Sequence, residues 1–196
     1  KYDIPGESIE LQRGILKSGE TLAALLGSAG ISSKTIHQAV LRAKEVFDVT
    51  RMKAGQPYAF YTAASGASGD VTHFVYEKNP IDYVVFDFQS PITVISKSKP
   101  VIKKTRAAVG TIESSLWQTL SSAELDPRMA VMMSDIFAWT IDFHHIQKGD
   151  QFTVVFDELF VDDKNIGPER IQAVRFIHMG KPYEAFMHET NGLLKY

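Results

Sequence analysis

The sequence of 196 residues contains no cysteine. This absence excludes a disulfide framework, a thiol nucleophile and every cysteine-based zinc or iron–sulfur site. Net charge is also small, because 21 Lys and Arg stand against 23 Asp and Glu for a formal charge of −2. That balance disfavours nucleic-acid binding, which draws much of its affinity from neutralised phosphates. No apolar run approaches the ~20 residues that cross a bilayer, so we expect no transmembrane segment.

The residues that are present favour a folded globular protein. Apolar residues make up 44% and charged residues 22% of the chain. It begins at Lys1 rather than Met, which indicates a processed or trimmed product whose signal segment would lie upstream. At the other end, Asn191-Gly192 is a strong hairpin signal whose return strand has barely begun at Tyr196. We therefore expect the natural polypeptide to continue beyond Tyr196, the alternative being a short edge strand at a true terminus.

The chain resembles itself at an offset of 94 residues. This offset aligns Leu22 with Leu116 and Leu26 with Leu120, among other apolar and glycine positions. Each copy reads as helix, turn, helix, turn, strand. The expected elements are helices over Thr21–Ser28, from Ser32 or Ser33 onward, over Ser115–Ser122 and over Pro127–Ala138, and strands over Tyr58–Thr62 and Phe152–Phe156.

Outside the two copies the sequence alternates as in β-strands. Turn signals occur at Lys78-Asn79-Pro80, at Asp162–Asn165 and at His178–Lys181. The segment Ala63–Gly69 (AASGASG) is small, polar and turn-prone, which predicts a linker. We therefore predict an α+β fold of two domains. Residues 1–63 form a small β-α-α-β domain, and residues 64–196 form an antiparallel sheet carrying the second helix pair at about 113–140.

Catalytic and metal-binding motifs are missing from the sequence. The histidines are His37, His73, His144, His145, His178 and His188, and they include no H-x-H pair and none followed four residues later by Asp. There is also no G-x-S-x-G elbow, P-loop or dinucleotide fingerprint. We therefore assign no catalytic residue and no metal ligand in this chain, and a zinc trio drawn from distant residues stays a minor alternative.

Two clusters of charged residues have both a structural and a binding interpretation. The concentrated basic run consists of Lys97, Lys99, Lys103, Lys104 and Arg106. It indicates either an edge strand protected against aggregation or a contact with an anionic polymer. The acidic pairs Asp157-Glu158 and Asp162-Asp163 are interpreted as solvated turns, with calcium binding as the alternative.

Two aromatic and two imidazole side chains are similarly ambiguous. Trp117 and Trp139 lie at predicted helical positions. Packing in the core is the first interpretation for them, and stacking on a sugar is the second. His144 and His145 are interpreted as residues at the end of a helix, where positive charge is favourable.

Two short segments carry a first resemblance. They are Lys17-Ser18-Gly19-Glu20-Thr21-Leu22 and Met52-Lys53-Ala54-Gly55-Gln56. With the helix pair between them, they resemble a LysM-like domain of the opacity-associated type over residues 9–62. The resemblance implies a β-α-α-β fold that binds peptidoglycan glycan, with Ser18, Gly19, Glu20, Thr21, Gly55 and Gln56 as candidate contacts. The alternative is that Gly19 and Gly55 satisfy turn geometry and Thr21 caps a helix.

A wider resemblance covers nearly the whole chain. Its segments are Ile81–Phe86, Gly110–Leu120, Ser134–Trp139, Ile141–Phe143, Gln147–Asp150 and His178–Tyr183. Together they resemble the N-terminal region of a LytM/lysostaphin-type zinc metalloendopeptidase of the bacterial cell envelope. In that family two N-terminal domains precede a catalytic domain that cleaves peptide cross-links of peptidoglycan. Its zinc ligands come from H-x-x-x-D and H-x-H motifs in the catalytic domain.

This second resemblance implies a regulatory and positioning role. The chain would cover the active site of its own C-terminal catalytic domain, and Zn is expected in that domain. The implied partners are this domain, peptidoglycan and envelope regulatory proteins, in the periplasm or cell envelope. Two alternatives are a peptidoglycan glycan-binding module and an envelope protein-interaction scaffold.

Overall fold

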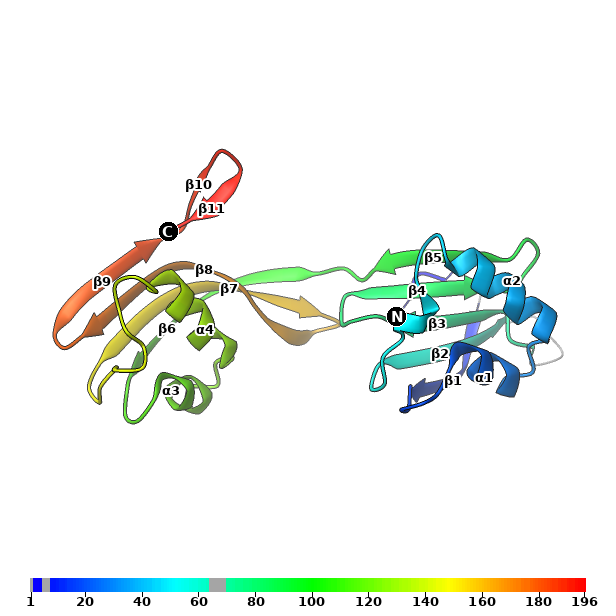
Figure 1. Cartoon of the computed structure of the whole chain (residues 1–196), viewed down its shortest axis with the longest axis horizontal. Helices are drawn as coiled ribbons and strands as arrows, with labels where there is room; N and C mark the ends of the chain where they lie inside the picture. Colours follow the sequence, from blue (N-terminus) through cyan, green and yellow to red (C-terminus); the bar gives the residue numbers. More distant parts are fainter. Residues whose placement is uncertain (1, 5–7, 64–69) are drawn as a thin grey trace. The chain divides into compact units, whose positions relative to one another are not determined.

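The computed structural model describes residues 2–4, 8–63 and 70–196, and the chain forms two units, Lys1–Pro100 and Val101–Tyr196 (Figure 1). Unit 1 contains β1 (Ser8–Ile15), α1 (Leu22–Ser28), α2 (Ser33–Ala43), a 3-10 turn at Val49–Arg51, β2 (Pro57–Ala63), β3 (His73–Glu77), β4 (Asp82–Asp87) and β5 (Thr93–Ser98). Unit 2 contains β6 (Ile102–Thr111), α3 (Leu116–Ser122), α4 (Arg128–Ile136), β7 (Gln151–Val161), β8 (Lys164–His178), β9 (Lys181–Phe186), β10 (His188–Thr190) and β11 (Leu193–Lys195).

Both units are antiparallel meanders with a helix pair inserted after the first strand. The sheet of unit 1 has the strand order β1-β2-β3-β4-β5, and that of unit 2 has the order β6-β7-β8-β9. Strands β10 and β11 form a separate hairpin around Asn191-Gly192. Helices α1 and α2 lie on one face of the first sheet, and α3 and α4 on one face of the second. The α+β class is confirmed.

Alternating side chains give the sheet of unit 1 two apolar faces. Phe74 and Phe86 pack with Leu26 of α1 in the core beneath the helices. Val75 and its neighbours on the other face form a second cluster, against which Tyr2 packs. The central strand β3 is therefore buried along its whole length.

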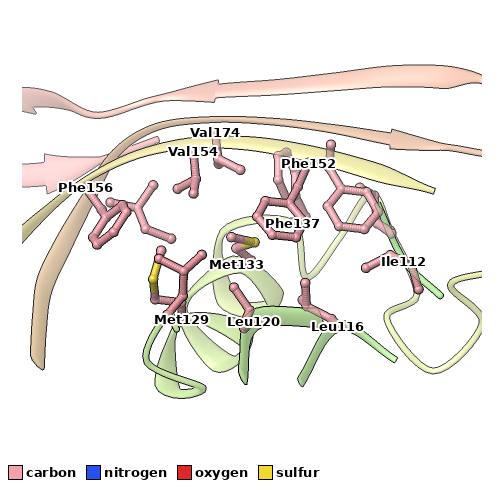
Figure 2. Close-up of a cluster of buried hydrophobic side chains, with 14 residues drawn as sticks. Ile112, Leu116, Leu120, Met129, Met133, Phe137, Phe152, Val154, Phe156 and Val174 are labelled. Carbon is pink, nitrogen blue, oxygen red and sulfur yellow. The ribbon is translucent and has the colours of Figure 1, made fainter. Parts of the chain in front are cut away.

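The core of unit 2 lies between the helix pair and one face of its sheet. Figure 2 shows Leu116 and Leu120 of α3 and Met129 and Met133 of α4 turned toward Phe152 and Phe156 of β7. These side chains are almost fully buried. The apolar residues along each helix thus form the buried face of the helix pair.

The internal repeat extends to the backbone hydrogen bonds. In unit 1 the Leu16 carbonyl accepts from the Gly55 N–H at 2.8 Å, and in unit 2 the Ile112 carbonyl accepts from the Gly149 N–H at 2.8 Å. Gly55 and Gly149 are 94 residues apart, whereas Leu16 and Ile112 are 96 apart. The loop between the first strand and the first helix is therefore two residues longer in unit 1.

Helix ends follow the same repeat. Thr21 caps α1 by accepting from the Ala24 N–H at 3.2 Å, and Ser115 caps α3 in the same way. After α1 the chain turns through Gly30 with φ +84°, and after α3 it turns through Glu124 with φ +55°. The helix predicted over Thr21–Ser28 is confirmed, with Thr21 as its cap and Gly30 just beyond its end.

One glycine in each unit lies beneath an aromatic ring. Gly14 of β1 pairs with Tyr58, and Gly110 of β6 pairs with Phe152. A Cβ atom at either glycine would overlap the ring of its partner. Phe152 is buried, so its ring cannot move aside into solvent.

The observed division of the chain differs from the predicted boundary between residues 63 and 64. Strands β2 and β3, which flank that boundary, are paired, and Phe60 lies opposite Phe74. Strands β3 to β5 complete the sheet that α1 and α2 cover, so they belong to unit 1. Residues 64–69 of the predicted linker Ala63–Gly69 lie outside the described residues.

Two local interpretations were wrong. Asp157 and Glu158 lie within β7 and are 3% and 1% exposed, so they form no solvated turn. His144 and His145 lie in the loop between α4 and β7, beyond the end of the helix at Ile136. The turn predicted at Asp162-Asp163 is present between β7 and β8.

Candidate functional site

The six candidate glycan contacts lie on two loops of unit 1 that the backbone ties together. Ser18, Gly19, Glu20 and Thr21 lie in the β1–α1 loop, and Gly55 and Gln56 precede β2. Leu16 joins the loops, because its carbonyl accepts from Gly55 N–H and its N–H donates to the Gln56 carbonyl at 2.9 Å. The structure therefore brings the six residues into adjoining loops.

Several of the six have a local structural role. Glu20 Oε2 accepts from the Lys17 N–H at 2.7 Å, and Thr21 caps α1. Gly19 and Gly55 have φ values of +82° and +88°, where a side chain is unfavourable. The roles of Thr21, Gly19 and Gly55 are those of the alternative interpretation, and glycan binding by the six residues stays a prediction.

The basic run is largely paired within the protein. Its residues lie on or beside β5 and β6, which are edge strands, so their expected position at a sheet edge is confirmed, whereas protection against aggregation stays a prediction. The contacts are Lys97–Asp3 at 2.7 Å, Lys99–Glu77 at 3.0 Å, Lys103–Glu169 at 2.5 Å, Arg106–Glu158 at 2.9 Å, and Lys104 Nζ at 4.3 Å from the Phe160 ring centre. This pairing leaves less positive charge for an anionic polymer.

The buried carboxylates of β7 also have partners within the sheet. Asp157 Oδ1 accepts from Thr105 Oγ1 and from Gln172 Nε2, both at 2.7 Å. Glu158 pairs with Arg106. Because these acceptors already have donors from neighbouring strands, they hold the sheet together and do not form a calcium site.

Asp150 links two turns of unit 2. Its carboxylate accepts from the Gln147 N–H at 2.8 Å and the Met179 N–H at 3.0 Å, and it lies 2.7 Å from His178 Nδ1. Burial acts to raise the pKa of Asp150. The hydrogen bonds act in the opposite direction and together outweigh burial, so the pKa lies below its ordinary value. Asp150 therefore fixes the turn before β7 against the β8–β9 turn.

The donor set does not fit a zinc site. In residues 2–4, 8–63 and 70–196, no three His, Asp or Glu side chains form a group that could hold a metal ion. The histidine–carboxylate contacts are separate pairs, His73–Asp87 at 3.7 Å, His145–Asp142 at 2.7 Å and His178–Asp150 at 2.7 Å. Each pair supplies two candidate ligands, whereas zinc sites in proteins use three or more protein ligands.

Both tryptophans are exposed, so the prediction that they pack in the core was wrong. Trp117 on α3 is 61% exposed, and Trp139 after α4 is 99% exposed. Trp139 borders a hollow of about 480 Å³ in unit 2. Another hollow, of about 760 Å³, lies between α2 and the loop after β4 in unit 1. Neither is lined by the six candidate glycan contacts.

The helices of the described residues are short. α2 has 11 residues, and within the described ranges no helix has the length and apolar character needed to cross a bilayer.

Comparison with known sequences identifies relatives over most of the chain. Residues 102–194 match the family model described as the Csd3 second domain, and this segment nearly coincides with unit 2. The peptidoglycan DD-endopeptidase ShyC of Vibrio cholerae serotype O1 is 24% identical over 177 residues, which are 89% of this chain and 40% of the relative. An uncharacterized metalloprotease of Haemophilus influenzae is 24% identical over 174 residues, which are 89% of this chain and 36% of the relative. The chain thus spans well under half the length of either relative.

Solved structures share the fold. A zinc containing peptidase from Vibrio cholerae matches with a TM-score of 0.65 and 14% identity, over 91% of this chain and 55% of that one. Csd3 of Helicobacter pylori, in an orthorhombic crystal, matches with a TM-score of 0.62 and 13% identity, over 91% and 48%.

Proposed function

This chain belongs with the N-terminal, non-catalytic domains of the Csd3- and ShyC-type peptidoglycan endopeptidases, and from that premise we propose that it regulates and positions a C-terminal catalytic domain. The supporting observation is one of coverage. The alignment takes in 89% of this chain but only 40% of the endopeptidase ShyC. Unit 2 coincides with the family's second domain. Zinc and the hydrolysis of peptide cross-links would belong to the remaining part of the polypeptide, in the periplasm or cell envelope.

Regulation would operate by covering the active-site groove. A cover suppresses hydrolysis when it binds the groove more tightly in a closed state than in an open one, and a partner that favours the open state releases it. A hundredfold preference for the closed state corresponds to about 2.8 kcal/mol. A difference of that size is within reach of a modest protein contact.

The test is a peptidoglycan digestion assay with the parts supplied separately. The 196-residue chain is added to the catalytic domain of the same polypeptide, and an unrelated protein at equal concentration serves as the control. We expect the release of soluble fragments to fall as the chain is added. Unchanged digestion at high micromolar chain would count against the cover.

Glycan binding by the LysM-like loops of unit 1 is a second candidate role. The observation that favours it is that Leu16 holds the two loops together. Ser18, Gly19, Glu20, Thr21, Gly55 and Gln56 would supply the contacts. In that case a β-1,4-linked N-acetylglucosamine oligomer would shift the backbone amide NMR signals of Gly19 and Gly55.

A further inference from the structure

Trp139 is a large apolar side chain that this fold leaves bare. It is 99% exposed, so its indole ring makes almost no contact with the rest of the protein. Tryptophan is highly buried on average, and in binding surfaces it is enriched among the residues that supply most of the affinity. An indole exposed to this degree on a folded unit is available to stack on a ligand.

The backbone beside Trp139 is anchored on the core of unit 2. Phe137 and Ile141 are buried on either side of it. Phe143 stacks on Phe137 with ring centres 6.4 Å apart, and it contacts Phe176 with ring centres 5.2 Å apart. These contacts fix the segment, so the residues between them are presented to solvent from a firm base.

The adjacent hollow combines polar and apolar groups in equal number. Its volume is about 480 Å³, and it is lined by Ser134, Ala138, Trp139, Thr140, Ile141, Asp142, Phe143 and His144. Asp142 is set in place by the turn, because it accepts from the His144 N–H at 3.0 Å and lies 2.7 Å from His145 Nδ1. The hydrogen bonds from His145 and His144 lower the pKa of Asp142, so its carboxylate remains an acceptor near neutral pH.

This combination matches a sugar better than a protein surface. A pyranose ring has a face of C–H groups that stacks on an aromatic ring, and a rim of hydroxyls that hydrogen-bonds to Asp, His, Ser and Thr side chains. The centre of a protein interface is depleted of charged residues, unlike this hollow with Asp142 and His144. A nucleic acid is disfavoured by the same carboxylate and by the net charge of −2.

We propose that unit 2 carries a saccharide-binding surface, in which Trp139 stacks on a pyranose ring and Thr140, Asp142 and His144 contact its hydroxyls. The natural source of the sugar would be the amino-sugar strand of peptidoglycan, and this part of the proposal rests on the proposed function. The binding of a saccharide itself does not. The residues of this surface all belong to unit 2 and include none of the loop residues of unit 1 around Gly19 and Gly55.

The experiment uses the two tryptophans as reporters in the full 196-residue chain. Incorporation of 5-fluorotryptophan gives two ¹⁹F NMR signals, and Trp117→Phe assigns the remaining one to Trp139. The probe is the β-1,4-linked N-acetylglucosamine tetramer. We expect a saturable shift of the Trp139 signal with a dissociation constant on the order of 1 mM, and little change at Trp117, which does not line the hollow.

Variants separate the binding surface from the fold. Trp139→Ala should weaken binding of the tetramer at least tenfold while circular dichroism and the thermal midpoint stay unchanged, because the side chain is not packed. Trp117→Ala is the matched control and should bind normally. Equal binding by Trp139→Ala and the unchanged chain would overturn the proposal.

Three further outcomes would also overturn it. The first is no shift of the Trp139 signal at 10 mM tetramer, which is roughly ten times the expected dissociation constant. The second is a shift of the Gly19 and Gly55 amide signals alone. The third is a shift of the Trp139 signal when the protein concentration is raised without sugar. The last would assign Trp139 to a contact between copies of the chain. Failure of sugar binding leaves the digestion assay with the separated catalytic domain unaffected, so the two proposals fail independently.

Discussion

Glu124 occupies a backbone conformation that favours glycine. Its φ of +55° follows α3, at the place where Gly30 with φ +84° follows α1. A side chain in this left-handed region crowds the following carbonyl at a cost of about 1–2 kcal/mol. The two copies of the repeat therefore differ in how well one residue suits its turn.

We predict that Glu124→Gly raises the free energy of unfolding of unit 2 by up to about 1 kcal/mol, and that Gly30→Ala lowers that of unit 1 by a similar amount. Urea denaturation measures both changes. Glu124→Ala is the control, because it removes the charged side chain and keeps the strained backbone. A loss of stability in Glu124→Gly would contradict this account.

Residue-scale prediction from the sequence succeeded where the relevant chemistry is local. Thr21 and Gly30 were identifiable as the cap and stop of α1 from their types and spacing alone. The partners of Asp157 are Thr105, 52 residues away, and Gln172, 15 residues away. No local pattern reports such contacts, so its burial was missed.

Trp139 is the site residue that sequence reasoning misplaced. α4 ends at Ile136, so Trp139 lies three residues beyond the helix and outside the set of side chains that the helix buries. For Trp117 a signal was available. Leu116 and Leu120 define the buried face of α3, and the residue after Leu116 is turned about 100° away from it.

At the scale of elements, the fully buried strand β3 contains a titratable side chain, that of His73. His73 is 2% exposed, its Nε2 has no hydrogen bond, and Asp87 Oδ2 lies 3.7 Å away. Burial lowers the pKa of His73, and the charge of Asp87 offsets this only in part. The neutral imidazole is therefore the form that the folded strand accepts.

We predict that unit 1 loses stability as pH falls below about 6.5, the ordinary histidine value. Below it the unfolded chain binds a proton that folded His73 resists, so protonation favours unfolding. His73→Gln should flatten the dependence of the unfolding free energy on pH between pH 7.5 and 5.5 in urea denaturation. Exposed His37→Gln is the control and should leave the slope unchanged. A slope that is equally steep in His73→Gln would contradict the prediction.

Turns were predictable at this scale, whereas strand partners were not. Asn79-Pro80, Asp162-Asp163 and Asn191-Gly192 mark observed hairpins because their residue types favour turn geometry. The segment Ala63–Gly69 has the composition of a turn and equally of a domain linker. Only the pairing of β2 with β3 decides between them, and that pairing depends on the shared core beneath α1 and α2.

At the scale of the whole molecule, each unit has its own sheet and core. Leu26 and Leu120 hold equivalent places 94 residues apart, and both are fully buried. We predict that Leu26→Ala destabilises unit 1 and Leu120→Ala unit 2, each by about 2–5 kcal/mol. Hydrogen exchange should show lost amide protection in β2–β4 for the first variant and in β7–β8 for the second. Equal loss in both units from either substitution would contradict separate cores.

The glycines beneath Tyr58 and Phe152 constrain how this protein can diverge. Gly14 and Gly110 have no room for a methyl group while the opposing ring stays in place. Selection should remove a substitution of either glycine alone, because the added Cβ atom would overlap the opposing ring. The substitution becomes tolerable once the facing aromatic residue has been replaced by a smaller one. In related sequences, each glycine and its facing aromatic residue should therefore change together, the aromatic residue first.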